Sequence, residues 1–258
     1  MPEADLALLQ RTAEAAGDIA LSHFRNAPRV WDKDAGAGPV TEADLEVDAY
    51  LRETLTAARP GTAWLSEETP DTPDRLTARD VFVVDPIDGT RAFIEGARAW
   101  GLSLALVRDG QPIAAVVHMP ALERTYTAAA GAGARQNGVP LTVSARTDLT
   151  GATVVATRPN MDASRWPNGV PPVERHFRSS LAYRMCLVAS GRFDAMLTLR
   201  PAWHWDIAAG ALIITEATGI TTDPTGKPLT FNTPDPRAPG VIAGGTAVHT
   251  GLLSAGPL

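Results

Sequence analysis

Two closely spaced carboxylates stand out in the stretch Asp85–Thr90, which follows the apolar run Val81–Val84. Such a run is typical of a buried central strand, so we expect Asp85 at the end of a strand. A proline fixes one backbone angle and Gly89 permits a tight turn into a helix, which keeps Asp85 and Asp88 close together. Because like charges repel, the pair is tolerable only if a cation lies between the carboxylates or one is protonated. Hard oxygen ligands on a rigid turn suit Mg²⁺.

The end of this stretch has the character of an anion site. Free N–H groups of Gly89 and Thr90, at the start of a helix, would face an anion such as phosphate. The alternative is a solvated Asp-rich turn in which Thr90 caps the helix, because short motifs also occur by chance.

Two further acidic stretches favour the metal interpretation. Ser66-Glu67-Glu68 follows the apolar residues Ala63–Leu65 at a predicted strand end. Trp205-Asp206 opens a predicted helix, although capping is the better explanation for Asp206 taken alone.

Composition narrows the class of protein. The chain has 258 residues, of which 45% are hydrophobic and 20% charged, as in an ordinary globular protein. Its 23 basic and 29 acidic side chains give a net charge of −6, and the arginines are spread out, so we expect no nucleic-acid partner. No apolar run approaches the roughly 20 residues of a membrane span, and acids near the N-terminus argue against a secretory signal. The lone Cys186 fits a reducing compartment, which favours the cytoplasm.

Hydrophobic periodicity predicts the elements that position the acids. Apolar spacing predicts helices through Leu6–Ala20 and Val47–Leu55, the second beginning with a capping box from Thr41 to Asp44. Asp109-Gly110 predicts a hairpin between two apolar runs. The other predicted elements are strands at Tyr126–Ala129, Leu141–Val143, Thr153–Ala156, Phe193–Leu199 and Gly240–Ala243, and helices at Leu181–Ser190 and Asp206–Thr218.

The pattern of elements changes near residue 148. We therefore expect an N-terminal α+β half over residues 1–148, with most of the acids, and a C-terminal α/β half over residues 149–258, with Asp206. The segment Pro159–Pro172, rich in Pro, Asn and Gly, is expected on the surface.

Taken together, these segments resemble the inositol monophosphatase family, Mg²⁺-dependent and lithium-sensitive phosphomonoesterases that include the bisphosphate nucleotidases. The resemblance covers nearly the whole chain. It implies an α/β fold, the layered αβαβα sandwich of the inositol monophosphatase and fructose-1,6-bisphosphatase type, and a homodimer. It is carried by residues Gly38–Asp44, Ser66–Glu68, Asp85–Thr90, Trp205–Gly210 and Glu216–Gly219.

The resemblance also implies two to three Mg²⁺ ions in one site. Glu67, Asp85 and the carbonyl group of Ile87 would hold the first ion. Asp85, Asp88 and Asp206 would hold the second, and Glu67 would help to bind a third.

Further roles follow from the same resemblance. Gly89 and Thr90 would bind phosphate through backbone donors, and Asp44 would orient the Thr90 hydroxyl toward the attacking water. Glu68 would support the ligands from behind. Lys33 either shapes the loop near the third metal or is a solvated charge.

A covalent aspartyl-phosphate route is an alternative, because Asp88-Gly89-Thr90 is similar to part of the Asp-x-Asp-Gly-Thr motif of haloacid-dehalogenase-like phosphatases. That motif needs a nucleophilic Asp where this chain has Pro86. Hydrolysis by metal-activated water needs no such nucleophile.

The second half is expected to select the alcohol part of the substrate. Inositol-selective members commonly carry an acid seven residues before the Asp of the Trp-Asp pair, where this chain has Leu199, which cannot accept hydrogen bonds from ring hydroxyls. Arg178-Ser179-Ser180-Leu181 resembles the Ser-Ser-Leu-Lys run of CysQ-like 3′(2′),5′-bisphosphate nucleotidases, with Ala182 in place of the Lys. Arg178, Arg184 and Arg200 would each receive a second phosphate, or are exposed ion-pair partners.

The sequence thus favours, by a small margin, a bisphosphate nucleotidase acting on a small phosphorylated metabolite. An inositol-1-monophosphatase, or a broad phosphatase that includes histidinol phosphate, is the alternative. A non-catalytic protein of the same fold that senses phosphorylated metabolites is a third class, and the full set of metal-position acids argues against it.

Overall fold

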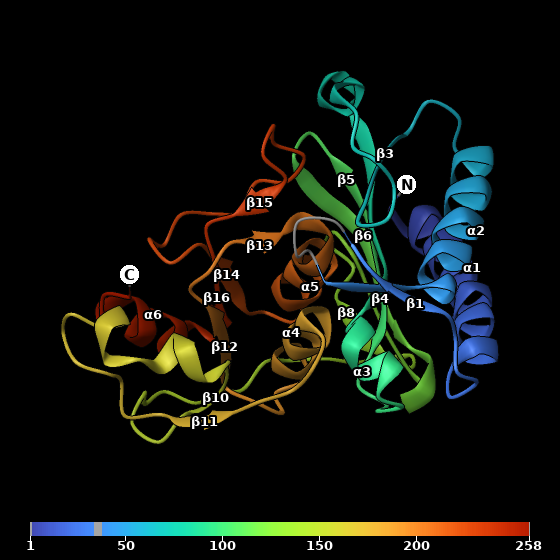
Figure 1. The fold of residues 1–258 in the computed structure, drawn as a ribbon. Helices are drawn as coiled ribbons and strands as arrows, with labels where there is room; N and C mark the ends of the chain where they lie inside the picture. Colours follow the sequence, from blue (N-terminus) through green and yellow to red (C-terminus); the bar gives the residue numbers. More distant parts are fainter. Residues whose placement is uncertain (1, 34–37, 258) are drawn as a thin grey trace.

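Five layers of helices and sheets stack across the molecule (Figure 1). They are seen in a computed structural model that describes residues 2–33 and 38–257. The predicted αβαβα sandwich is confirmed. In order, the layers are α1 (Pro2–His23) with α2 (Glu42–Ala58), a seven-stranded sheet, α4 (Leu181–Ala189) with α5 (His204–Glu216), a five-stranded sheet, and α6 (Thr246–Ser254).

The seven-stranded sheet carries the first group of acids. Its strands lie side by side in chain order: β3 (Ala63–Ser66), β4 (Asp80–Asp88), β5 (Gly101–Arg108), β6 (Gln111–Met119), β7 (Arg124–Ala129), β8 (Ala134–Gln136) and β9 (Val139–Pro140). β3 runs parallel to β4, and Ser66 pairs with Val84. Because parallel strands end at the same edge, the residues that follow this pair, Glu67 and Asp85, emerge side by side.

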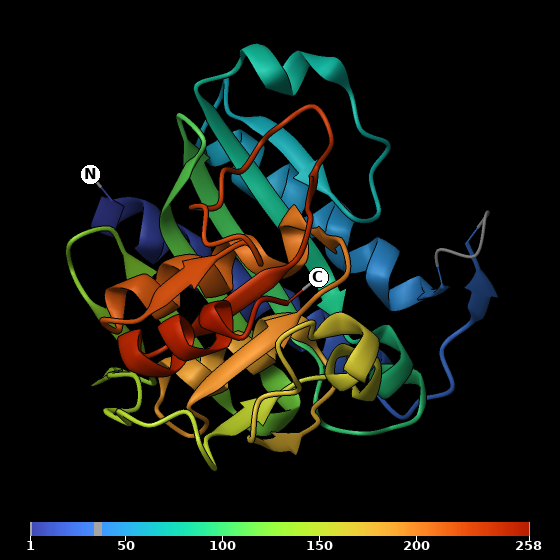
Figure 2. The ribbon, with the colours of Figure 1, turned by 90° about the vertical axis from the view of Figure 1, so that its left-hand side faces the viewer.

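The five-stranded sheet and α6 form the other side of the molecule, which faces the viewer in Figure 2. The strand order is β11 (Glu174–His176), β10 (Thr153–Val155), β12 (Ala195–Thr198), β16 (Val241–Gly244) and β14 (Ile220–Thr222). Two short ribbons pair β1 (Val30–Asp32) with β2 (Pro39–Thr41) and β13 (Ala202–Trp203) with β15 (Arg237–Ala238). A short helix, α3 (Thr90–Ile94), follows β4.

Helix α5 in the middle layer is apolar on nearly all of its faces. Every residue of α5 from Ile207 to Ile214 is buried, because the helix contacts β-strands of the first sheet and α4 together. Gly210 allows the close approach of α4, since a Cβ atom there would lie 2.6 Å from the side chain of Met185. This packing fixes the position of the α5 N-terminus, where Asp206 lies, relative to the first sheet.

Local signals near the site were predicted well. The capping box is confirmed: the Thr41 hydroxyl accepts the N–H of Asp44, and the Asp44 carboxylate accepts the N–H of Thr41. The cap therefore holds the Asp44 side chain in a single orientation at the start of α2.

Several predicted elements need correction. Leu141–Val143 is not a strand; its N–H groups bond to Ala134 and to Ala217, a helix C-cap, so no regular ladder forms. α5 begins two residues earlier than expected, at His204. α6 was not predicted, because Gly245 caps it without a side-chain hydrogen bond. Within Pro159–Pro172, Trp166 is buried, so that segment is not wholly a surface excursion.

The strands of the first sheet all come from residues 63–140 and those of the second from residues 153–244. The expected change near residue 148 therefore falls between the two sheets. Across the described ranges, no helix is both long enough and apolar enough to cross a bilayer.

Candidate active site

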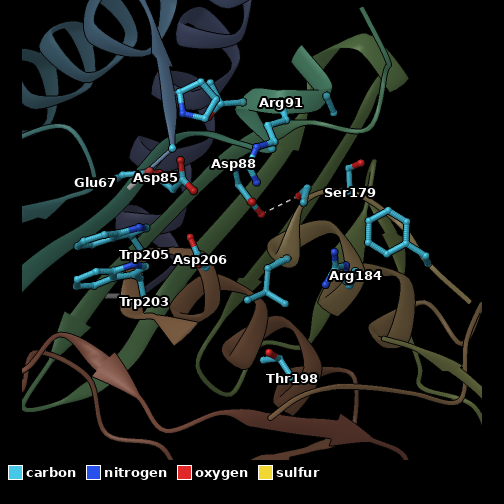
Figure 3. A pocket seen from close by; sticks show the side chains of 18 of the residues that line it. Glu67, Asp85, Asp88, Arg91, Ser179, Arg184, Thr198, Trp203, Trp205 and Asp206 are labelled. Atoms are coloured by element: carbon cyan, nitrogen blue, oxygen red, sulfur yellow. Dashed lines mark hydrogen bonds between the residues drawn. The ribbon is translucent and has the colours of Figure 1, made fainter. Parts of the chain in front are cut away.

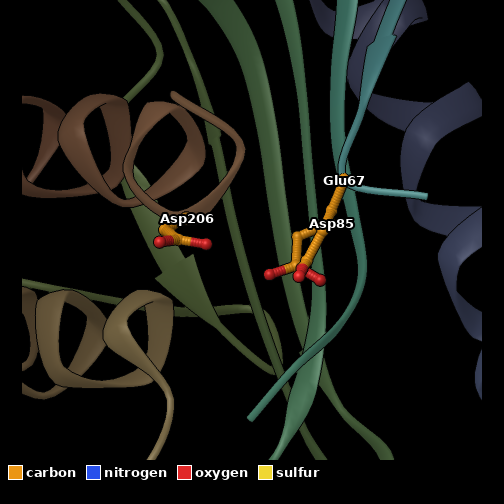
Figure 4. A group of neighbouring side chains, drawn as sticks. All are labelled: Glu67, Asp85 and Asp206. Atoms are coloured by element: carbon orange, nitrogen blue, oxygen red, sulfur yellow. The ribbon is translucent and has the colours of Figure 1, made fainter. Parts of the chain in front are cut away.

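Three carboxylates from distant parts of the chain converge at the junction of the first sheet and α5. One oxygen each of Glu67, Asp85 and Asp206 lies within 4.8 Å of the others (Figure 4). Glu67 follows β3, Asp85 lies within β4, and Asp206 lies in the first turn of α5. The Asp206 side chain faces the other two, and the N-cap residue of α5 is Trp203, so Asp206 does not cap the helix.

The surroundings of this cluster disfavour three free negative charges. Burial, and next the charges of Glu67 and Asp88, raise the pKa of Asp85 well above its ordinary value. Burial, and next the charges of Asp88 and Glu67, do the same for the pKa of Asp206. A divalent cation would neutralise the cluster, and three carboxylates supply the hard oxygen donors that Mg²⁺ prefers. The residues present therefore fit a magnesium site.

Asp88 lies beside the cluster rather than in it. Its Oδ2 atom accepts hydrogen bonds from the Ser180 hydroxyl at 2.7 Å and the Ala182 N–H at 2.6 Å. Asp85 and Asp88 are 1% and 8% exposed, so the alternative of a solvated Asp-rich turn is wrong. The carbonyl oxygen of Ile87 lies 3.2 Å from the Thr90 hydroxyl oxygen and is a second acceptor within reach of its single proton.

The turn after β4 leaves backbone N–H groups at the start of α3 that an anion could approach. Gly89, rather than Thr90, is the N-cap of α3, with φ +99°. A Cβ atom on Gly89 would lie 3.2 Å from the Ala99 carbonyl oxygen and 3.4 Å from Cβ of Ser180. The first N–H groups of a helix have no partner within the helix, so those at Gly89 and Thr90 suit a phosphate oxygen.

Thr90 also connects this turn to α2. Its hydroxyl lies 3.3 Å from Oδ1 of Asp44, whose Oδ2 accepts the Thr41 hydroxyl at 2.5 Å. Burial, partly offset by hydrogen bonds from Thr41, raises the pKa of Asp44 to about 6. At neutral pH Asp44 is therefore ionised and accepts hydrogen bonds from both threonines.

Lys33 is an ion-pair partner, so its alternative as a solvated loop charge is wrong. Its ammonium lies 2.7 Å from Glu67 and 2.6 Å from Glu68, and its side chain is only 17% exposed. Burial raises the pKa of Glu68 to about 7 although Lys33 opposes this. Glu67 and Glu68 thus contact the same ammonium.

The acids line a cleft of about 460 Å³ between the first sheet and the α4–α5 layer. Polar and aromatic side chains from the second half form its opposite wall (Figure 3). They include Phe177, Ser179, Arg184, Thr198, Arg200, Trp203 and Trp205.

The three predicted arginines have different surroundings. Arg184 is 8% exposed, donates its Nε–H to the Arg178 carbonyl at 2.6 Å and stacks on Phe177. Among the described residues, no carboxylate lies within ion-pair distance of Arg184 or Arg200, and both line the cleft. Arg178 does not line it, because its guanidinium bonds to the Phe177 carbonyl and lies over Phe193.

Leu199 does not face the cleft, contrary to the argument from spacing. It is 5% exposed and packs in the core beneath the second sheet, while its neighbours Thr198 and Arg200 line the cleft. Successive side chains of an extended segment point to opposite faces. Thr198 and Arg200 therefore face the cleft, and Leu199 between them faces the core. Thr198 offers a hydroxyl, and Leu199 is no argument against a polyol substrate.

Sequence reasoning missed several residues of the cleft. Ser180 was quoted only as part of a motif, yet it contacts Asp88; its signal was a serine directly before an apolar helix. Trp203 and Trp205 stack at 4.6 Å with an interplanar angle of 8°. Arg91 also lines the cleft. Trp205 directly precedes Asp206 in the sequence, whereas no local pattern marks Trp203 or Arg91 as a neighbour of the acids.

A layered αβαβα sandwich with a carboxylate cluster beside a turn that suits a phosphate oxygen is the arrangement expected of a phosphoric monoester hydrolase. The model of the inositol monophosphatase family matches residues 2–255, and the chain belongs to this family.

Relatives of different specificity match the chain at comparable levels. A histidinol-phosphatase of Chlorobaculum parvum is 32% identical, covering 97% of this chain and 96% of the relative. A 3′(2′),5′-bisphosphate nucleotidase CysQ of Aggregatibacter actinomycetemcomitans is 33% identical, with 85% and 84% covered. An inositol-1-monophosphatase of Rhizobium meliloti is 37% identical, with 74% of each chain covered. The solved structure of a Thermotoga maritima IMPase superposes with a TM-score of 0.83 at 26% identity, with 99% and 96% covered.

Proposed function

We propose that the protein is a Mg²⁺-dependent phosphatase of small phosphate monoesters that carry a second anionic group, with a 3′(2′),5′-bisphosphate nucleotide as the best candidate. The observation that carries this choice is Arg184, a buried guanidinium with no carboxylate partner among the described residues at the wall of the cleft. The hydrogen bond to the Arg178 carbonyl and the contact with Phe177 do not neutralise this charge, and a phosphate of the substrate would supply an anionic partner at the cleft.

The metal ligands in this proposal come from both halves of the chain. Glu67, Asp85 and the Ile87 carbonyl would hold one Mg²⁺, Asp85, Asp88 and Asp206 a second, and Glu67 would contribute to a third. Bound Mg²⁺ neutralises charge on the phosphate and lowers the pKa of a water molecule in its shell. The pKa values of Asp85 and Asp206, raised by burial and mutual repulsion, support this assignment.

The chain's own groups orient the reactants. The N–H groups of Gly89 and Thr90 would bind the phosphate oxygens. The Thr90 hydroxyl donates to Asp44, which leaves its oxygen lone pairs to accept a hydrogen bond from the attacking water; as the hydroxyl took the water proton, its own proton would pass to Asp44. Asp44 would hold this hydroxyl in place and favour removal of the proton, since it is ionised above about pH 6.

Arg184 and Arg200 would bind the second phosphate at the wall opposite the acids. The similarity to the CysQ nucleotidase over 85% of the chain supports this choice. Ser179 lies at the same wall and offers a further hydroxyl.

A second candidate substrate is histidinol phosphate. The aromatic side chains of Phe177, Trp203 and Trp205 at the cleft suit a planar ring, and a relative named histidinol-phosphatase aligns with 97% of the chain. These two observations favour histidinol phosphate over a phosphate ester whose alcohol part has no planar ring.

The deciding experiment compares kcat/KM for adenosine 3′,5′-bisphosphate, histidinol phosphate and inositol 1-phosphate at saturating Mg²⁺. The proposal predicts the highest value for the bisphosphate. A higher value for histidinol phosphate or inositol 1-phosphate would reject the choice of substrate. No phosphate release from any of the three, with Mg²⁺ bound, would support the sensor alternative.

Three further properties follow from the family. We propose a cytoplasmic homodimer that lithium inhibits, and the lone buried Cys186 supports a reducing compartment. Light scattering on the purified protein and phosphate release with and without LiCl test the dimer and the inhibition.

A further inference from the structure

The Ser180 hydroxyl is committed to two hydrogen bonds at the start of α4. Its oxygen accepts the N–H of Tyr183 at 3.0 Å, as the N-cap of the helix. That bond occupies a lone pair, so the hydroxyl proton points to Asp88, whose Oδ2 lies 2.7 Å away. Ser180 is only 6% exposed, so most of its surface is shielded from water. Ser180 therefore donates to Asp88 in a fixed direction.

Asp88 is held by two donors on a single oxygen. Besides the Ser180 hydroxyl, the N–H of Ala182 donates to Oδ2 at 2.6 Å. This arrangement fixes the plane of the Asp88 carboxylate and leaves Oδ1 as the oxygen with which it can bind a cation. The helix N-terminus stabilises the negative charge, so Asp88 stays in this orientation when ionised.

The backbone at Ser180 is distorted in a way that serves this contact. Its φ of +63° is unusual for a residue with a side chain. The same residue packs against the phosphate turn, since a Cβ atom on Gly89 would lie 3.4 Å from Cβ of Ser180. The close approach of Gly89 and the start of α4 hold Ser180 where its hydroxyl reaches Asp88.

We propose that Ser180 is a positioning residue that holds Asp88 in the orientation from which it binds the second cation, and so sets the affinity of that cation. The inference rests on the proposed metal site. Arg184 lies one turn further along α4. The same helix would therefore position Asp88, through Ser180, and also carry the arginine that binds the second phosphate.

The test is a Mn²⁺ titration of the free protein by calorimetry or electron spin resonance, without substrate. In Ser180→Ala we expect one class of Mn²⁺ site to weaken by about 10–100-fold, as is typical when a group that supports a metal ligand is removed. The other class, on Glu67, Asp85 and the Ile87 carbonyl, should keep its affinity.

Two companion variants separate positioning from folding. Ser180→Gly removes the hydroxyl but tolerates the positive φ, so it should fold even where Ser180→Ala does not, and it should show the same loss. Ser190→Ala removes a hydroxyl at the other end of α4, where it bonds to the Leu187 carbonyl, and should bind Mn²⁺ like the wild type.

The outcomes are distinguishable. Wild-type Mn²⁺ affinity in Ser180→Gly would overturn the role of Ser180 and leave the metal site standing. An equal loss in Ser190→Ala would also overturn it, because the effect would then come from loosening of α4. A wild-type protein that binds no Mn²⁺ would overturn the metal site and this inference together.

Discussion

The Thr90 hydroxyl lies 3.3 Å from the Asp44 carboxylate, although the two residues stand at the starts of different helices, α3 and α2. Asp44 is also part of the capping box of α2, so a single side chain both stabilises a helix and orients a hydroxyl at the cleft. The orientation of the Asp44 carboxylate is therefore set by the helix cap before any ligand binds.

Replacing Asp44 by Asn should separate these two roles. The amide oxygen can still accept from Thr41, so the thermal midpoint should change little, whereas kcat should fall about 10²–10⁴-fold as the negative charge that helps proton removal is lost. Steady-state kinetics and thermal melting check both parts. Unchanged kcat would remove Asp44 from the reaction, and a large loss of Mn²⁺ affinity would reassign it to the metal site.

Replacing Asp206 by Asn should have opposite effects on stability and activity. In chelator, the variant should melt at a higher temperature than the wild type, because one of three repelling carboxylates is gone. Activity should fall by more than the roughly 100-fold typical of a lost supporting group. Adding Mg²⁺ should raise the melting temperature of the wild type more than that of the variant. A variant that melts lower in chelator would show that Asp206 is not repelled by its neighbours.

The stability of the metal-free protein should fall as pH rises from about 5 to 8. The pKa of Asp44 is raised to about 6 and that of Glu68 to about 7, mainly by burial. Because the folded state then binds more protons than the unfolded state, the free energy of unfolding decreases with pH across this window. Melting in EDTA and in Mg²⁺ at several pH values checks this. The fall should be smaller in Mg²⁺, since the cation favours the ionised acids; equal slopes would contradict a cation at this cluster.

Replacing Arg184 by Gln should impair only substrates with a second anionic group. Loss of hydrogen bonds to a charged group costs about 1.5–3 kcal/mol, so kcat/KM for adenosine 3′,5′-bisphosphate should fall about 10- to 150-fold. The value for inositol 1-phosphate should change far less. Arg178→Gln is the matched control, because its guanidinium lies outside the cleft. An equal loss on both substrates would assign Arg184 to general stability of the site.

Replacing Gly89 by Ala should damage both stability and turnover. The new Cβ atom would lie 3.2 Å from the Ala99 carbonyl oxygen at a φ of +99°, so the turn must shift. Gly131→Ala is the control, since φ there is +77° and nothing lies within 4 Å of the added atom. Both variants should melt lower, but only Gly89→Ala should lose activity in a phosphate-release assay. Wild-type turnover in Gly89→Ala would show that this turn does not bind the phosphate.

Short-range patterns were sufficient for many elements. The capping box at Thr41 and Asp44 was predictable because its two hydrogen bonds depend only on residues three apart. The turn at Gly89 follows from residue type for the same reason. Leu199 was misjudged because spacing along the chain does not reveal which face of an extended segment a residue occupies.

The sequence by itself determined the strand-end acids Glu67 and Asp85 and the turn at Gly89, since each depends on periodicity or turn chemistry within a few residues. It indicated the layered fold through its resemblance to the inositol monophosphatase family. Only the tertiary structure decided that Asp206 joins the first two acids while Asp88 turns toward Ser180, and that Arg184, unlike Arg178, lines the cleft. These relations depend on how α4 and α5 pack between the two sheets. That packing is set by contacts between residues far apart in the chain, which no local pattern encodes.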